Sequence, residues 1–305
     1  MLDLDLLVAP TTADEFLQRH WPSRPGYFDG DSERLAPVLS ALPELGSGER
    51  ILEVFEDRVT LLRPDGFFAN VPNGAAALSF YRAEYTCFLR RVERYVPGLE
   101  QVATQMAATL GVPRDVLHCE VFTSTGNGGE VYANASGLPM HSDFEATFAL
   151  LLAGRKVWRW APNEHIRNQT ATLVGGQGAQ IDSAQLSLAD KLPLPSEMPQ
   201  DAQTAEVTAG GVIFMPRGWW HQTVAHGDCL QLNFTLKGPT WISILCDALS
   251  KRLLTDADWR EYAYGVVGTE EQRSRAQEEF RKLLGGLVSD LGKDGAAEAL
   301  LSSLS

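Results

Sequence analysis

The sequence predicts a mainly β protein with flanking helices, in which a sandwich or barrel is followed by a small C-terminal helical region. Short apolar runs separated by Gly, Pro and His-Gly-Asp turn signals fill residues 119–237, as is typical of sandwiches and barrels. Helical periodicity returns at Trp241. A length of 305 residues with 44% apolar content suits one large β-rich domain with an appendage, or two modest domains.

The N-terminal part begins with a helix and then two strands. Residues 11–20 predict a short helix, capped by Thr12 or Asp14, and a Pro- and Gly-rich loop follows it. Apolar runs at 51–56 and 59–63 predict two strands that lead into a Pro-Asp-Gly turn.

Helical spacing then precedes the main run of strands. Residues 76–110 predict helices that are separated at Pro97-Gly98. The alternation and turn signals beyond them predict strands at 119–125, at 148–154 and 156–162 with a break at Ala153-Gly154, and three more within 205–238. The polar segment 162–206 predicts a long excursion with at most short strands.

After Trp241 the pattern predicts helices at 241–254, 255–267, 272–291 and 295–304. Apolar residues recur there at helical spacing: Ile242, Leu245, Leu249, Phe280, Leu283, Leu284 and Leu287. A segment this short needs a partner surface, which is either a second copy of the chain or the outer wall of its own barrel.

Composition excludes several classes of protein. The net charge of −13 disfavours nucleic-acid binding, and it either attracts a basic protein or simply maintains solubility. The chain has no apolar run long enough to cross a membrane, and its acidic N-terminus is unlike a secretory signal. Four scattered cysteines without CxxC spacing fit a reducing cytoplasm, so we expect a cytoplasmic location.

Three residues have the types and spacing of metal ligands. His141 and Asp143 lie two apart in an extended segment, so both can face one interior, and His221 follows an apolar strand and a Pro-Arg-Gly turn. Taken singly, His141 and Asp143 have the pattern of a hydrogen-bonded pair on the surface, and His221 has that of a core histidine. Taken together, they form a set of two histidines and one carboxylate that favours non-haem Fe(II). A closed zinc site would need a fourth ligand, usually a thiolate, and only Cys229 is near either motif.

Lys156 is a candidate for binding an anionic co-substrate. By strand alternation it shares a face with Trp158 and Trp160, and the two tryptophans indicate that this face is buried. A buried cation requires a charged partner, and the far carboxylate of 2-oxoglutarate would supply one. The alternative is that Lys156 faces solvent, as Arg155 and Arg159 do.

Together these motifs resemble the JmjC-type hydroxylases, and most closely their bacterial cupin-like branch, which includes ribosomal oxygenases. The likeness runs from about residue 12 to residue 241 and is strongest at 119–160 and 207–237. It is carried by His141, Asp143, Phe148, Gly154, Lys156, Trp158, the run from Gly210 to His221, and Asn233-Phe234.

The resemblance implies a double-stranded β-helix of the cupin, or jelly-roll, type with N-terminal helices over residues 1–240, and a C-terminal helical region, used by relatives for dimerisation, over 241–305. It implies that iron is bound by His141, Asp143 and His221 and that Lys156 binds the C5 carboxylate of 2-oxoglutarate. It also implies that Thr147 and Asn233 lie near the co-substrate.

The expected function is therefore Fe(II)-, 2-oxoglutarate- and O2-dependent hydroxylation of an amino-acid side chain in a protein or peptide. One alternative substrate is a free small molecule, such as an amino acid or a natural-product intermediate. Another alternative is an inactive metal-binding cupin that serves as an interaction module. No nucleic-acid or membrane partner is expected, and the implied assembly is a homodimer.

Overall fold

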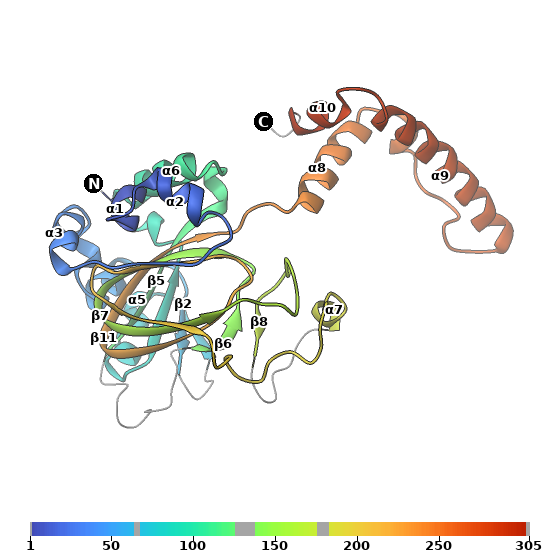
Figure 1. Cartoon of the computed structure of the whole chain (residues 1–305). Helices are drawn as coiled ribbons and strands as arrows, with labels where there is room; N and C mark the ends of the chain where they lie inside the picture. Colours follow the sequence, from blue (N-terminus) through green and yellow to red (C-terminus); the bar gives the residue numbers. More distant parts are fainter. Residues whose placement is uncertain (1, 64–67, 126–137, 176–182, 303–305) are drawn as a thin grey trace. The chain divides into compact units, whose positions relative to one another are not determined.

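The computed structural model describes residues 2–63, 68–125, 138–175 and 183–302 (Figure 1). The chain divides into two compact units, Met1–Gly238 and Pro239–Ser305. Across the described ranges, no helix combines the length and apolar character that a membrane crossing requires.

The first unit contains every strand in the described part of the chain. Its helices are α1 (Leu4–Val8), α2 (Ala13–Arg19), α3 (Ser32–Ala41), α4 (Gly48–Val54), α5 (Gly74–Arg82), α6 (Leu99–Leu110) and α7 (Ser183–Leu186), with 3-10 turns η1 (Pro43–Gly46), η2 (Val92–Arg94) and η3 (Arg114–Val116). Its strands are β1 (Gly26–Phe28), β2 (Val59–Leu62), β3 (Phe68–Val71), β4 (Thr86–Arg90), β5 (Leu117–Ser124), β6 (Leu138–Ser142), β7 (Ala146–Ala161), β8 (Leu173–Val174), β9 (Gln203–Thr208), β10 (Val212–Met215) and β11 (Trp220–Leu236).

The strands form two layers that share the long strands β7 and β11. One layer has the order β1-β10-β7-β11-β5-β4-β2-β3 and is antiparallel. The other layer also contains β7 and β11. In it, β9 pairs with β7, β6 pairs with β11, and β8 pairs with β6. This confirms the predicted mainly β fold of the cupin, or jelly-roll, type with flanking helices.

A bend, and not a break, joins the two halves of β7 and β11. The strand pairing shifts register between His226 and Leu230 and again between Leu230 and Gln231, and it is regular on both sides of these shifts. Gly154 has a φ of +85°, and a Cβ atom there would lie 2.4 Å from the carbonyl oxygen of Asp228. The predicted break at Ala153-Gly154 is therefore wrong, because glycine lets one strand bend between layers.

The outer face of the first layer packs against the helices. Phe16 of α2 contacts Phe148 and Phe214 of the sheet, with ring centroids 5.3 Å and 5.0 Å apart. Thr12 caps α2 and forms a capping box with Glu15, as the sequence predicted for Thr12. In Figure 1, α1, α2 and α6 lie over one face of the sheet.

The space between the layers has its own apolar cluster, which is separate from the helix-covered core. It comprises Ala149, Leu151, Trp158, Trp160, Ala205, Val207, Ile213 and Met215, with Trp219 packed against it. Burial of Lys156, Trp158 and Trp160 follows the predicted alternation, because successive side chains of a strand point to opposite faces. Trp158 of this cluster also lines the pocket that holds the candidate site.

Two further local predictions in the first unit are wrong. Residues 51–54 belong to helix α4, because Ser47 caps the helix and Ile51 and Leu52 both become fully buried on one side of it. Residues 86–90 form strand β4 and not helix, since the chain turns at Glu84, where φ is +64°, and then pairs with β2 and β5. Burial of one helix face overrides the local pattern at 51–54, and strand pairing overrides it at 86–90.

The second unit contains α8 (Trp241–Leu253), the 3-10 turn η4 (Asp258–Arg260), α9 (Glu270–Leu291) and α10 (Ala296–Ser302). The helix predicted at 255–267 is wrong, because this segment contains only η4 and turns, with Gly265 at a φ of +79°. The other predicted helices of this region are present.

Candidate metal centre

Strand pairing brings the three predicted metal ligands together. His141 is near the end of β6, and Asp143 follows that strand directly. His221 is the second residue of β11 and lies opposite His141 in the β6–β11 ladder. Residues 80 positions apart in sequence therefore become neighbours because their strands are adjacent.

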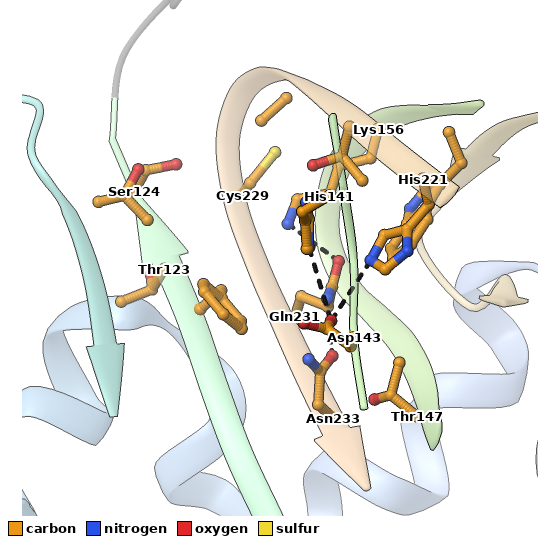
Figure 2. Close-up of a pocket in the computed structure, with 15 residues that line it drawn as sticks. Thr123, Ser124, His141, Asp143, Thr147, Lys156, His221, Cys229, Gln231 and Asn233 are labelled. Carbon is orange, nitrogen blue, oxygen red and sulfur yellow. Dashed lines mark hydrogen bonds and ion pairs between the residues drawn. The ribbon is translucent and has the colours of Figure 1, made fainter. Parts of the chain in front are cut away.

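The donor atoms of these residues converge on one point (Figure 2). The Nε2 atoms of His141 and His221 each lie 3.5 Å from Oδ2 of Asp143, and one ligand atom from each residue falls within 4.8 Å of the others. Donors that share one ion at first-row metal distances lie about 3 to 3.5 Å apart. The arrangement therefore fits a divalent metal with little movement.

His221 is oriented by its own backbone. Its Nδ1 atom is 3.0 Å from the carbonyl oxygen of Trp219, and since a carbonyl only accepts, Nδ1 must carry the proton. The lone pair is therefore on Nε2, which faces Asp143. Burial, and then the nearby His141, lower the pKa of His221 to about 4, so the ring is neutral and able to bind a metal near pH 7.

Asp143 is kept ionised by its neighbours. Burial raises its pKa, but the hydrogen bond to His141, the positive charges that His141 and His221 carry when protonated, and the Thr172 hydroxyl together lower the pKa well below its usual range. The Thr172 hydroxyl donates to Oδ1 over 2.9 Å, while Oδ2 faces the two histidines. The carboxylate is thus held with one oxygen toward the metal position.

Lys156 extends into the pocket beside the three ligands. The pocket is lined by all six predicted site residues, and Figure 2 shows Lys156 on the far side of the histidines from Asp143. The Lys156 ammonium donates a 2.9 Å hydrogen bond to Oε1 of Gln231 and lies 5.8 Å from the ring centre of Phe122. Among the residues that the structure describes, no carboxylate pairs with it, and burial lowers its pKa to about 8.

Thr147 and Asn233 line the same pocket on the opposite side from Lys156 (Figure 2). The Thr147 hydroxyl oxygen is buried and has no hydrogen-bond partner within the described ranges, so a polar ligand group would satisfy it. Asn233 accepts a 2.6 Å hydrogen bond from Nε2 of Gln231. Gln231 therefore joins Lys156 to Asn233.

Sequence reasoning missed Gln231, although a signal was present. Gln231 precedes Asn233 by two residues in one strand, so both point to the same face.

Sequence reasoning also missed two carboxyl groups near Asp143. Burial raises the pKa of Glu120 to about 7, although the Thr235 hydroxyl donates to its carboxylate over 2.9 Å, and burial and Asp143 also raise the pKa of Glu145.

Comparisons with known proteins agree with this architecture. The family model of the cupin-like domain matches residues 120–235. The Bacillus subtilis (strain 168) protein YxbC, described as uncharacterized, is 23% identical over 298 residues, which cover 95% of this chain and 87% of that protein.

Two solved structures of Escherichia coli YcfD are also similar. One is an X-ray structure with a TM-score of 0.48 and 15% identity, and the match covers 90% of this chain and 68% of that one. The other is described as a ribosomal oxygenase in complex with cobalt and 2-oxoglutarate; its TM-score is 0.41 and its identity 16%, with 93% and 67% of the two chains covered. The residues that match the cupin-like domain model, 120–235, include all six predicted site residues.

Proposed function

We propose that this chain is an Fe(II)- and 2-oxoglutarate-dependent oxygenase that hydroxylates an amino-acid side chain in a protein or peptide. The observation that carries the proposal is one pocket that contains both the convergent His141, Asp143 and His221 and the buried Lys156. A structural metal site alone would not require the lysine.

The donor set fits non-haem iron. Two imidazole nitrogens and one carboxylate oxygen would hold the metal from one side, and such a set leaves positions open for a co-substrate and oxygen. Iron and 2-oxoglutarate, when bound, supply the oxidation: one atom of O2 enters a substrate C–H bond, the other enters succinate, and CO2 is released. The protein holds the donors in place, and the Trp158 and Trp160 cluster keeps water from the interior.

Lys156 and Gln231 provide the anchor for the co-substrate. Lys156 has only an amide oxygen as its hydrogen-bond partner in the described part of the chain, so a carboxylate would pair with it. Gln231 holds the ammonium group in position through its Oε1 atom. The buried Thr147 hydroxyl is available for the end of the ligand that faces the metal.

A protein or peptide substrate is favoured by the resemblance to the JmjC-type hydroxylases. Phe122 also lines the pocket, and it stacks on Phe88 of the neighbouring strand β4, with ring centroids 4.3 Å apart. In this proposal, the aromatic pair provides an apolar surface for residues that flank the reacting side chain.

An anaerobic titration tests the proposal. Fe(II) and 2-oxoglutarate together should produce the weak visible charge-transfer absorption of the chelate, and neither should do so alone. Admission of air should then convert 2-oxoglutarate to succinate. A protein that binds iron but shows no absorption change with 2-oxoglutarate would leave only the inactive metal-binding alternative.

Substrate class is tested by incubating the active protein with a peptide library and with free amino acids. A mass increase of one oxygen atom in peptides, and not in free amino acids, is the expected result. Oxidation of free amino acids alone would contradict the protein or peptide assignment and leave the oxygenase assignment intact.

A further inference from the structure

The first part of the polar segment 162–206, which follows β7, contacts the back of the metal site. Ile166 and Leu173 are buried there beside Met140 of β6 and Trp220 of β11, on the opposite side of these strands from the pocket. This contact places a polar stretch of the excursion directly behind the ligand-bearing residues.

Gln169 is the centre of that contact. It is 0% exposed, and its Nε2 atom donates to the carbonyl oxygen of Ser142 over 2.7 Å and to the Ser142 hydroxyl over 2.8 Å. Ser142 is also fully buried and lies between His141 and Asp143. Asn163 fixes the glutamine amide by donating to its Oε1 atom over 3.3 Å.

The backbone carbonyl groups of Asn168 and Gln169 also hold the turn that leads to His221. Arg217 donates through Nη2 to the carbonyl oxygen of Asn168 over 2.8 Å and to that of Gln169. Asn168 adopts a left-handed backbone with a φ of +53°, a conformation that asparagine tolerates better than most residues. The adjacent Gly218 amide donates to the carbonyl oxygen of Asp143 over 2.8 Å.

We infer that the Asn168–Gln169 bridge positions the metal ligands by tying the His141–Asp143 segment to the turn before His221. This inference rests on the proposed function, because it assigns a role only if a metal binds. Gln169 and Arg217 are positioning residues that contact neither metal nor substrate. Groups that orient metal ligands in this way typically change metal affinity by about 10- to 100-fold when they are removed.

The chain offers a matched control. Gln185 is another buried glutamine of the same excursion, 6% exposed, and its amide donates to the Thr170 hydroxyl over 2.7 Å. Gln185→Leu therefore removes a buried amide without touching either ligand-bearing segment. Gln169→Leu and Gln185→Leu should both lower the stability of the metal-free protein, but only Gln169→Leu should weaken metal binding.

Co(II), added alone to the metal-free full-length protein, is the probe, and its visible absorption reports both affinity and ligand geometry. Wild-type protein should bind one equivalent, and His141→Ala should bind none at this site. Gln169→Leu should raise the dissociation constant at least about tenfold and alter the spectrum, whereas Gln185→Leu should stay within about twofold of wild type. Urea unfolding of each variant separates these effects from loss of fold.

If Gln169→Leu does not fold, Arg217→Met tests the other end of the bridge, because Arg217 is only partly buried. It should also weaken Co(II) binding at least severalfold. The inference is overturned if the folded Gln169 or Arg217 variant binds Co(II) with wild-type affinity. It is also overturned if Gln185→Leu loses as much Co(II) affinity as Gln169→Leu. In both cases the metal site itself stands. No Co(II) binding by the wild type overturns both the inference and the proposed function.

Discussion

Lys156 and Gln231 lie on the neighbouring strands β7 and β11, and the lysine ammonium donates a 2.9 Å hydrogen bond to the glutamine carbonyl inside the pocket. An amide oxygen satisfies one of three ammonium hydrogens and supplies no negative charge. The pair is therefore suited to receive a carboxylate.

Lys156→Ala should raise the 2-oxoglutarate concentration needed for half-maximal turnover more than tenfold, with little change in iron affinity. Loss of one member of a buried charge pair costs on the order of 2–5 kcal/mol. Steady-state kinetics at varied 2-oxoglutarate, together with iron titration, measures both quantities. Arg155→Ala is the control, since Arg155 forms a surface ion pair with Glu206 at 3.0 Å; a large effect there and none at Lys156 would contradict the assignment.

The affinity for 2-oxoglutarate should fall as pH rises through about 8. Burial lowers the pKa of Lys156 to about 8, so its protonated fraction decreases about tenfold between pH 7 and pH 9. Only the protonated form attracts a carboxylate, and the dissociation constant should rise by about that factor. Isothermal titration of the metal-loaded protein at both pH values checks this, and Lys156→Met should bind weakly at both.

His141→Ala, Asp143→Ala and His221→Ala should each abolish 2-oxoglutarate turnover and leave the fold intact. Each ligand faces a cavity, so its removal opens space without breaking the apolar clusters. Succinate production and circular dichroism measure the two effects. His226→Ala on the same strand β11 should retain activity, whereas retained turnover with stoichiometric iron in any of the three ligand variants would disprove the ligand set.

Glu120→Gln should stabilise the metal-free protein at pH 8 more than at pH 5. The folded pKa of Glu120, about 7, exceeds its ordinary 4.5 because of burial, so the folded state keeps a proton that the unfolded state has lost. Stability of the wild type therefore decreases as pH rises from about 4.5 to 7, and glutamine removes this decrease. Urea denaturation at the two pH values measures the difference, and equal stabilisation at both would contradict the prediction.

The full-length chain should form a homodimer through residues 241–305. Phe280, Leu284 and Val288 are exposed at successive turns of α9, and Ile242 and Leu245 are exposed on α8. An obligate interface buries more than about 1,000 Å² and is mostly apolar. Light scattering coupled to gel filtration should give twice the chain mass, and removal of residues 241–305 should give a monomer or an aggregate.

A charge placed on the apolar face of α9 tests whether that face forms the dimer interface. Leu284→Glu should shift the dimer to monomer, whereas Lys282→Glu, at an exposed position on the same helix, should leave it unchanged. A full-length protein that stays monomeric at high micromolar concentration would indicate that the helices pack on their own barrel.

The sequence alone predicted which side chains face the site because strand alternation is a local property. Two-residue spacing predicted that Lys156, Trp158 and Trp160 are buried together, and the structure buries all three. Residue types selected His141, Asp143 and His221, since few side chains bind metals, and the structure brings these three together. The same spacing would also have identified Gln231 from Asn233.

Tertiary structure decided what depends on contacts between distant segments. Residues 51–54 and 86–90 have local patterns that favour the wrong element, and packing against neighbouring helices and strands overrides them. The bend at Gly154 depends on the close approach of Asp228 from another strand. Gln169 lies in a polar segment without periodicity, so only the folded chain reveals that it contacts Ser142 from behind and, through Arg217, the turn before His221.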